Sequence, residues 1–147
     1  MERTLVLIKP DGIKRRLSGE IISRFERKGL KILGMKMLKL DRKRAEAHYA
    51  VHRDKPFFNE LVSYITSDPI IAIILEGRSV ISVVRGLAGS TDGSKAVPGT
   101  IRGDYANSIQ MNIVHASDSQ ESYEKEVAIF FNPDEIHSMV YGDEGLI

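Results

Sequence analysis

The stretch Ile70-Ile71-Ala72-Ile73-Ile74-Leu75 decides the fold, because six successive apolar residues are typical of a β-strand that is buried on both faces. Gly77 ends this strand, and Ser79 is the predicted N-cap of an apolar helix that follows it. The stretch therefore predicts a strand inside the core with a helix directly after it.

The first forty residues predict two strands with a helix between them. Thr4 to Lys9 is the first strand, and the turn residues Pro10-Asp11-Gly12 end it. Ser18 is a suitable N-cap for a helix over 18–28. Residues 30–40 are the second strand, where the alternation of apolar residues slips once and indicates an irregularity. Two further helices follow.

These two helices have their own start signals. Asp41 is the expected N-cap of a basic helix that runs to about Ala50, and Pro56 is expected to open the next one. The segment from 89 to 111 is different, because it has little apolar periodicity and several glycines. A long loop of this kind is usually functional or disordered. We expect a functional loop, because capped apolar elements resume at residue 112.

A short strand over 112–115 and a helix over 117–131 complete the chain. The core order is therefore β-α-β-β-α-β. This order predicts an α+β, ferredoxin-like fold, in which helices cover an antiparallel sheet of four strands. The chain has 147 residues, of which 42% are hydrophobic, so we expect one globular domain over 1–147.

The composition excludes several classes of protein. Cysteine is absent, which excludes a disulfide framework and a thiolate metal site. The apolar run near the N-terminus, Leu5 to Ile8, is too short for a signal peptide or a membrane span, and we expect a cytoplasmic protein. The net charge of +1 argues against specific binding to nucleic acid.

His115 is the most unusual of the four histidines. It ends an apolar run and directly precedes a polar helix start, whose free N–H groups attract anions. Glu126 lies on the helix that follows, within reach of the ring. A carboxylate bonded to one ring nitrogen fixes the tautomer and leaves the other nitrogen free to attack. A histidine alone is more often structural, so the assignment depends on its surroundings.

Three cationic residues are expected at the ends of separate elements, namely Lys9, Arg85 and Arg102. Singly, each is more often a partner in a surface salt bridge. Phosphoryl transfer, however, depends mainly on positioning and on neutralising the negative charge. Together with His115 these cations favour a phosphate site. The sequence has no P-loop motif, no G-x-G-x-x-G motif after a strand and no H-E-x-x-H motif.

Asn112-Ile113-Val114-His115-Ala116-Ser117-Asp118 resembles the N-x-x-H-[GA]-S-D signature of the nucleoside diphosphate kinase family. Three other segments are similar to family segments in the same order and spacing. They are Thr4 to Gly12, Pro56-Phe57-Phe58, and Pro98 to Asp104. The resemblance therefore covers nearly the whole chain.

The resemblance implies reversible transfer of the terminal phosphate of a nucleoside triphosphate to a nucleoside diphosphate. His115 would be the nucleophile of a ping-pong mechanism, Glu126 would orient its ring, and Ser117 would hold Glu126. The other implied site residues contact the nucleotide or lie close to the histidine: Lys9 and Asn112 at the ribose and nearby phosphate oxygens, Arg85, Thr91 and Arg102 at the phosphates, Tyr49 beside the histidine, and Phe57 against the base.

The resemblance also implies Mg²⁺, bound mainly through the nucleotide phosphates with few protein ligands, and a homo-oligomer, either hexamer or tetramer. The sequence departs from the family at Asp92-Gly93, where many members have a proline. Glycine frees the backbone where proline would fix it, which predicts a less rigid loop.

Three other functions compete with this interpretation. A non-catalytic ferredoxin-like module for nucleotide or RNA would need exposed aromatics among basic residues on the sheet, and Tyr105 and Phe130 do not form that pattern. A pseudo-enzyme would be expected to lack residues such as His115, Lys9 or Arg102. A nuclease would need carboxylate clusters that are not evident in the sequence.

Overall fold

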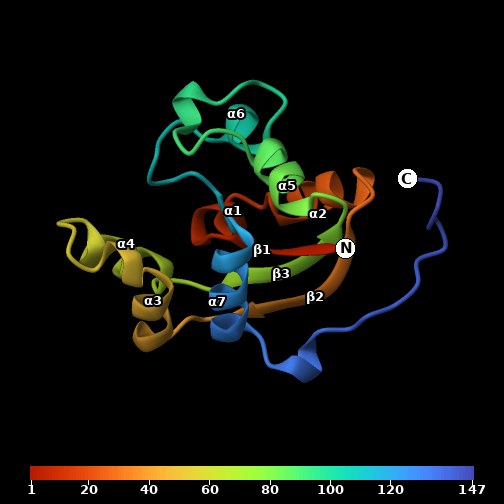
Figure 1. Ribbon diagram of the computed structural model, residues 1–147. Coiled ribbons are helices and arrows are strands. Elements are labelled where there is room, and N and C mark those ends of the chain that lie inside the picture. Colours follow the sequence, from red (N-terminus) through yellow and green to blue (C-terminus); the bar gives the residue numbers. More distant parts are fainter.

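The computed structural model describes residues 1–147 and contains one four-stranded sheet (Figure 1). The strand order is β2-β3-β1-β4, and every neighbouring pair is antiparallel. The strands are β1 (Glu2–Ile8), β2 (Lys31–Leu38), β3 (Ile70–Gly77) and β4 (Val114–Ala116). The ferredoxin-like order predicted from the sequence is confirmed.

Helices cover both faces of the sheet (Figure 1). Helices α2 (Ser18–Arg27) and α5 (Val80–Ala88) pack on one face. Helices α3 (Arg42–His48), α4 (Phe58–Ile65) and α7 (Gln120–Phe130) pack on the other face. The shorter elements are α1 (Pro10–Lys14), α6 (Ile101–Tyr105) and the 3-10 turns η1 (Ala50–His52), η2 (Gly93–Lys95) and η3 (Pro133–Glu135). None of the helices has the length and hydropathy needed to span a bilayer.

Strand β1 joins the two layers of the core, because its successive side chains point to opposite faces. Leu5 and Leu7 belong to the cluster beneath α3, α4 and α7, whereas Val6 and Ile8 belong to the cluster beneath α2 and α5. All four side chains are fully buried. This is why the central strands are continuous apolar runs.

Strand β2 contains the irregularity that the sequence predicted. Its register against β3 shifts between Ile32 and Gly34, which leaves Leu33 as the extra residue. Gly34 passes close to another part of the chain, because an added Cβ would lie 2.9 Å from the carbonyl oxygen of Glu135. The bulge therefore lets the C-terminal segment approach β2.

Several predicted local features were wrong. Pro10-Asp11-Gly12 is the first turn of helix α1, because Pro10 at the N1 position favours a helix start as much as a turn. Leu17, not Ser18, occupies the N-cap of α2, and the Ser79 side chain forms no capping hydrogen bond at α5. Helix α4 begins two residues after Pro56, at Phe58. Asp41, in contrast, caps α3 as predicted, accepting from the Arg44 amide at 2.8 Å.

The segment from 89 to 111 is not a structureless loop, because it contains η2 and α6. Thr100 caps α6 by accepting a hydrogen bond from the Gly103 amide at 2.9 Å. Asp92 caps η2 through the amide of Ser94. Both helices are too short to show apolar periodicity, so the sequence pattern gave no sign of them.

Gly93 approaches the backbone of Ala106 so closely that a side chain has no room. An added Cβ would lie 2.6 Å from both the carbonyl carbon and the carbonyl oxygen of Ala106. Gly93 lies where the sequence departs from the family pattern, and its backbone packs directly against Ala106. This contact restrains the loop, although the sequence predicted that it would be less rigid.

We predict that Gly93→Ala lowers the free energy of unfolding by roughly 1–3 kcal/mol, because the backbone around Ala106 must move. Gly86→Ala is the matched control, since Gly86 lies within α5 and nothing occupies the space around it. That change should stabilise the helix by up to about 1 kcal/mol. Urea unfolding of both variants measures the two effects, and equal stability would contradict the contact.

Candidate functional site

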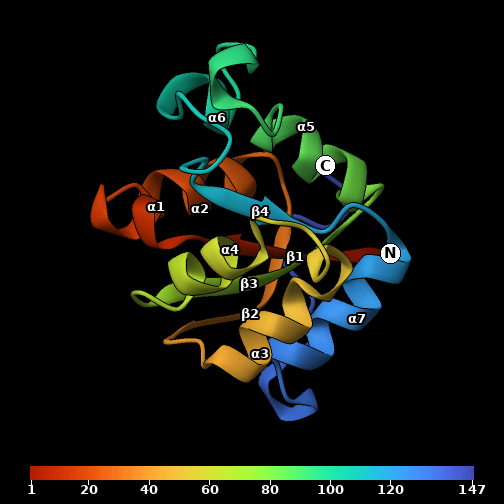
Figure 2. The same ribbon diagram turned by 90° about the vertical axis from the view of Figure 1, so that its left-hand side faces the viewer.

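The predicted site residues gather around β4, the strand that lies toward the viewer in Figure 2. There β4 crosses between α6 above and α3 and α4 below. His115 is the middle residue of β4 and pairs with Leu7 of β1. Residues directly opposite each other in a sheet point to the same face, so His115 faces α3 and α7.

His115 is bonded to a buried carboxylate. Its Nε2 lies 2.5 Å from Oε2 of Glu126, which lies in the second turn of α7. The hydroxyl of Ser117 donates to the other oxygen, Oε1 of Glu126, at 2.7 Å. Glu126 is 8% exposed and Ser117 fully buried. The three residues form a rigid chain from the core to the imidazole.

The chain fixes the tautomer of His115. A carboxylate can only accept, so in the neutral imidazole Nε2 carries the proton and Nδ1 keeps a free lone pair. The imidazole side chain is 29% exposed, enough for its free nitrogen to meet a ligand. The geometry that the sequence predicted for Glu126 and Ser117 is therefore present.

Lys9 and Asn112 form a second buried pair. The Lys9 ammonium donates to Oδ1 of Asn112 at 2.7 Å and to the carbonyl of Gln110 at 3.2 Å. The Asn112 amide in turn donates to the carbonyl of Thr91 at 2.9 Å. Burial lowers the pKa of Lys9 to about 8; the charge of nearby Asp11 raises it, and that of Arg102 lowers it. The pair joins β1 to the long segment.

Arg102 fastens the long segment to β4. Its guanidinium donates to three carbonyl oxygens, those of Asn112 at 3.2 Å, Gly89 at 2.8 Å and Val114 at 2.7 Å. Burial, and then the charge of Arg85, lower the pKa of Arg102 to about 10. A guanidinium has five N–H donors, so two remain for a ligand.

The other predicted residues lie around this centre. Arg85 is exposed in the last turn of α5, close enough for its charge to act on both Arg102 and Asp118. Thr91 is exposed and contributes its carbonyl to Asn112. Tyr49 lines the same cavity as His115, and burial raises the pKa of its hydroxyl to about 12.

Phe57 lies farther out than the other predicted residues. Its ring is 41% exposed at the N-cap of α4, 5.6 Å from the ring of His52. His52 is in turn 6.5 Å from the ring of Tyr49. The structure therefore connects Phe57 to the site only through a row of aromatic rings.

His48 was not predicted from the sequence. Its side chain is 2% exposed, and its ring packs edge-on against His115 with 4.6 Å between centroids. Neither of its nitrogens has a hydrogen-bond partner, and burial lowers its pKa well below the usual value. The sequence places it in a polar helix, where nothing distinguishes a buried histidine from an exposed one.

His48, His115 and Glu126 are the only group of potential metal ligands of this kind, and they do not fit a zinc ion as they stand. Two ligands about 2.0–2.1 Å from a tetrahedral zinc lie about 3.3 Å apart. Nε2 of His115 and Oε2 of Glu126 are only 2.5 Å apart, the separation of a hydrogen bond. The cluster is therefore a hydrogen-bonded group.

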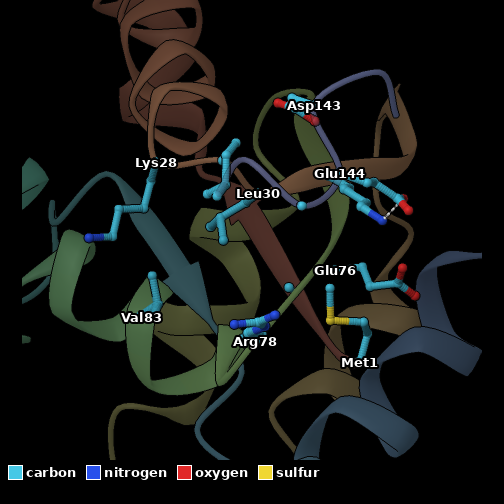
Figure 3. Close-up of a pocket in the computed structure, with 13 residues that line it drawn as sticks. Met1, Lys28, Leu30, Glu76, Arg78, Val83, Asp143 and Glu144 are labelled. Carbon is cyan, nitrogen blue, oxygen red and sulfur yellow. Dashed lines mark hydrogen bonds and ion pairs between the residues drawn. The ribbon is translucent and has the colours of Figure 1, made fainter. Parts of the chain in front are cut away.

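Cavity size does not identify the site. A cavity of about 310 Å³ lies beside His115, between α3, η1 and α7. A slightly larger one, of about 350 Å³, lies between the C-terminal segment, α2 and the end of β3 (Figure 3). The latter is lined by ion-pairing residues such as Lys31 and Glu144 and contains no histidine. The chemistry therefore points to His115.

Comparison with known proteins identifies the family of the chain. The family model for nucleoside diphosphate kinase matches residues 2–136. A nucleoside diphosphate kinase of Thermoplasma volcanium is 60% identical and covers 98% of both chains. The chain belongs to the nucleoside diphosphate kinase family. It is a phosphotransferase that moves the terminal phosphate from a nucleoside triphosphate to a nucleoside diphosphate.

Two solved structures are also similar to the chain. A halophilic nucleoside diphosphate kinase from Halobacterium salinarum, in complex with CDP, has a TM-score of 0.96 and 46% identity, and covers 99% of this chain and 97% of its own. A transition-state mimic of the nucleoside diphosphate kinase from Borrelia burgdorferi, with bound vanadate and ADP, has a TM-score of 0.92 and 36% identity. The match covers 97% of this chain and 94% of the Borrelia chain.

We predict that Arg102→Lys lowers the free energy of unfolding by at least roughly 2 kcal/mol, because one ammonium cannot reach three separate carbonyl oxygens. Arg27→Lys is the control, since Arg27 is exposed on α2. Denaturant unfolding would measure both variants. If both lose the same small amount, Arg102 does not hold the segment.

Proposed function

We propose that the transfer runs in two steps through a phosphorylated His115. The free lone pair on Nδ1 attacks the terminal phosphorus, a nitrogen–phosphorus bond forms, and the bond to the bridging oxygen of the diphosphate breaks. The bond electrons leave with the diphosphate, which dissociates. A second diphosphate then takes the phosphoryl group from the histidine by the reverse reaction.

The hydrogen-bonded chain to Glu126 supports this mechanism above all other features. In the neutral tautomer that donates from Nε2 to Glu126, Nδ1 keeps its lone pair, so no proton has to move in either step. When the nitrogen–phosphorus bond forms, the ring gains positive charge, and the carboxylate 2.5 Å away stabilises that charge. Ser117 holds the carboxylate in place, so little reorganisation accompanies the reaction.

Lys9, Arg85 and Arg102 would neutralise the charge on the phosphate oxygens, with Thr91 and Asn112 as polar contacts to phosphate and ribose. Two of these cations are partly desolvated, and charges in a dry site act more strongly than charges in water. The vanadate and ADP bound to the Borrelia relative support a phosphate site of this kind.

Phe57 and Tyr49 are the two aromatic residues that we expect to contact the nucleotide or lie beside the histidine. The exposed ring of Phe57 offers a face on which any base can stack, which suits an enzyme with a broad range of nucleotides. Tyr49, whose high pKa keeps its hydroxyl protonated, can donate a hydrogen bond next to the histidine. The CDP complex of the Halobacterium relative supports nucleotide binding.

Mg²⁺ fits this site only as a partner of the nucleotide. The ion prefers oxygen ligands, whereas the phosphate-facing side chains are cationic, and Asp11 is bonded to Tyr64 and Ile113. When bound with the nucleotide, Mg²⁺ would offset part of the negative charge of the phosphates. The protein's own residues would bind and orient the phosphates.

We also propose that the whole chain, 1–147, is one catalytic domain and that it assembles as a homo-oligomer, hexamer or tetramer, as the family resemblance implies. The cytoplasmic location expected from the sequence stays a prediction. None of these features changes the chemistry at His115.

We predict that γ-labelled ATP transfers acid-labile, alkali-stable label to the protein, and that added GDP removes this label as GTP. His115→Ala should form no labelled protein. His137→Ala should behave as the unsubstituted protein, because His137 is exposed and distant in sequence from the signature. Label that persists on the His115→Ala variant would exclude this nucleophile.

Glu126→Gln extends the same assay. It keeps the side-chain shape and removes the negative charge that stabilises the ring, so labelling should slow by about 10- to 100-fold. An unchanged rate would remove Glu126 from the mechanism.

We predict that ADP binding weakens as the pH rises through about 8, because Lys9 is cationic below its pKa of about 8 and neutral above it. The ADP phosphate does not obscure this step, since its own second pKa is about 6. Calorimetric Kd values between about pH 7 and pH 9.5 measure it. Lys9→Gln should bind weakly with no such pH dependence, and a constant Kd for the unsubstituted protein would contradict the assignment.

A further inference from the structure

The residue between Asn112 and His115 in the signature has a strained backbone. Ile113 is fully buried and has a φ of 75°, in the left-handed region that a β-branched residue rarely adopts. The Val114 amide donates to the carbonyl of Asn112 at 2.8 Å, across Ile113. A positive φ with a hydrogen bond between residues i and i+2 defines a rare, strained form of γ-turn.

Strain of this kind persists only where the surroundings hold it. Here the Ile113 amide donates to Oδ2 of Asp11 at 3.0 Å, and the Lys9 amide donates to the carbonyl of Ile113 at 2.8 Å. Both polar groups of the strained residue are therefore fixed by the chain that follows β1. The turn is held from α1, a different part of the sequence.

Asp11 is itself held in place. Its second oxygen, Oδ1, accepts a hydrogen bond from the hydroxyl of Tyr64 on α4, and that hydroxyl accepts from the Asp11 amide at 3.0 Å. Gly12 brings α1 against the turn, because an added Cβ would lie 3.1 Å from Cγ2 of Ile113. Asp11 therefore cannot move away from the turn without breaking its bonds to α4.

The strained turn sets the direction of the residues on either side. On one side, the Asn112 side chain points to the Lys9 ammonium at 2.7 Å. On the other, Val114 begins β4, whose pairing with β1 places His115 opposite Leu7. If Ile113 relaxed to a negative φ, the chain would leave the turn in a different direction, and Asn112 and His115 could not both keep their partners.

We infer that Asp11, braced by Tyr64, is a positioning residue for the phosphate transfer: its carboxylate holds the strained turn at Ile113 that aligns Asn112 and His115. This inference rests on the proposed function of His115. Asp11 forms no hydrogen bond with His115; its carboxylate accepts from the Ile113 amide and from the Tyr64 hydroxyl. It acts through the backbone of the signature.

The test is the single-turnover rate of phosphoenzyme formation at saturating ATP. Asp11→Ala should lower this rate by about 10- to 100-fold, because displacement of a reacting group by about 1 Å costs that much. Asp11→Asn can still accept from the Ile113 amide, so it should keep most of the rate. Asp68→Ala is the control. It removes a carboxylate that forms an ion pair with Lys14, which lies on α1 as Asp11 does, but it does not touch the turn at Ile113.

The same Asp11→Ala change, made in a protein that already carries Ile113→Gly, distinguishes a positioning role of Asp11 from a general loss of structure. Glycine adopts a positive φ without strain. In an Ile113→Gly protein, Asp11→Ala should therefore change the rate by less than about threefold, although the core has lost a side chain. If Ile113→Gly does not fold, Tyr64→Phe is measured instead. It should lower the rate less than Asp11→Ala does, because Asp11 still accepts the hydrogen bond from the Ile113 amide.

The outcomes distinguish the two proposals. If the unsubstituted protein forms no phosphoenzyme, the proposed function fails. If it does, but Asp11→Ala labels at the normal rate, the inference about Asp11 is overturned. An equal loss from Asp11→Ala in both backgrounds, or an equal loss for Asp11→Asn and Asp11→Ala, would also overturn it.

Discussion

The antiparallel pairing of β4 with β1 is the interaction on which the rest of the site depends. Strand β4 has three residues at the sheet edge, yet it pairs with a strand whose four central side chains are fully buried. The Ser117 amide extends the pairing by donating to the carbonyl of Leu5 at 3.0 Å. Backbone hydrogen bonds in a dry core are costly to break, so this pairing fixes the position of His115 on the sheet.

The same pairing decides which face of the sheet carries the chemistry. His115 points toward the layer of α3, α4 and α7, where Glu126 of α7 accepts its hydrogen bond. A buried carboxylate is destabilising unless it is bonded, and here each oxygen has a donor from His115 or Ser117. The cationic groups come from three other parts of the chain: Arg85 from α5, Arg102 from the 89–111 segment, and Lys9 from the end of β1, beside Tyr64 of α4.

Rigidity around the nucleophile depends on contacts between distant parts of the sequence. Arg102 joins the 89–111 segment to the start of β4 through the carbonyls of Asn112 and Val114, and Asp11 fixes the strained turn that precedes His115. These contacts are made by a guanidinium and a carboxylate, which an entirely apolar core would not contain. Position 93 also requires glycine, because its backbone passes too close to Ala106 to leave room for a side chain. The site and the stability of this region are therefore linked.

The sequence by itself determined the order of the four strands and the five longer helices, the bulge in β2 and the Asp41 cap, because alternation and capping are local patterns. It also pointed to His115 with Glu126, through a signature that fixes residue types at fixed spacing. Only the tertiary structure decided the burial of His48, the three carbonyl bonds of Arg102 and the positive φ of Ile113. Each of these arises from contacts between distant segments, and no local pattern encodes which groups the folded chain will bring together.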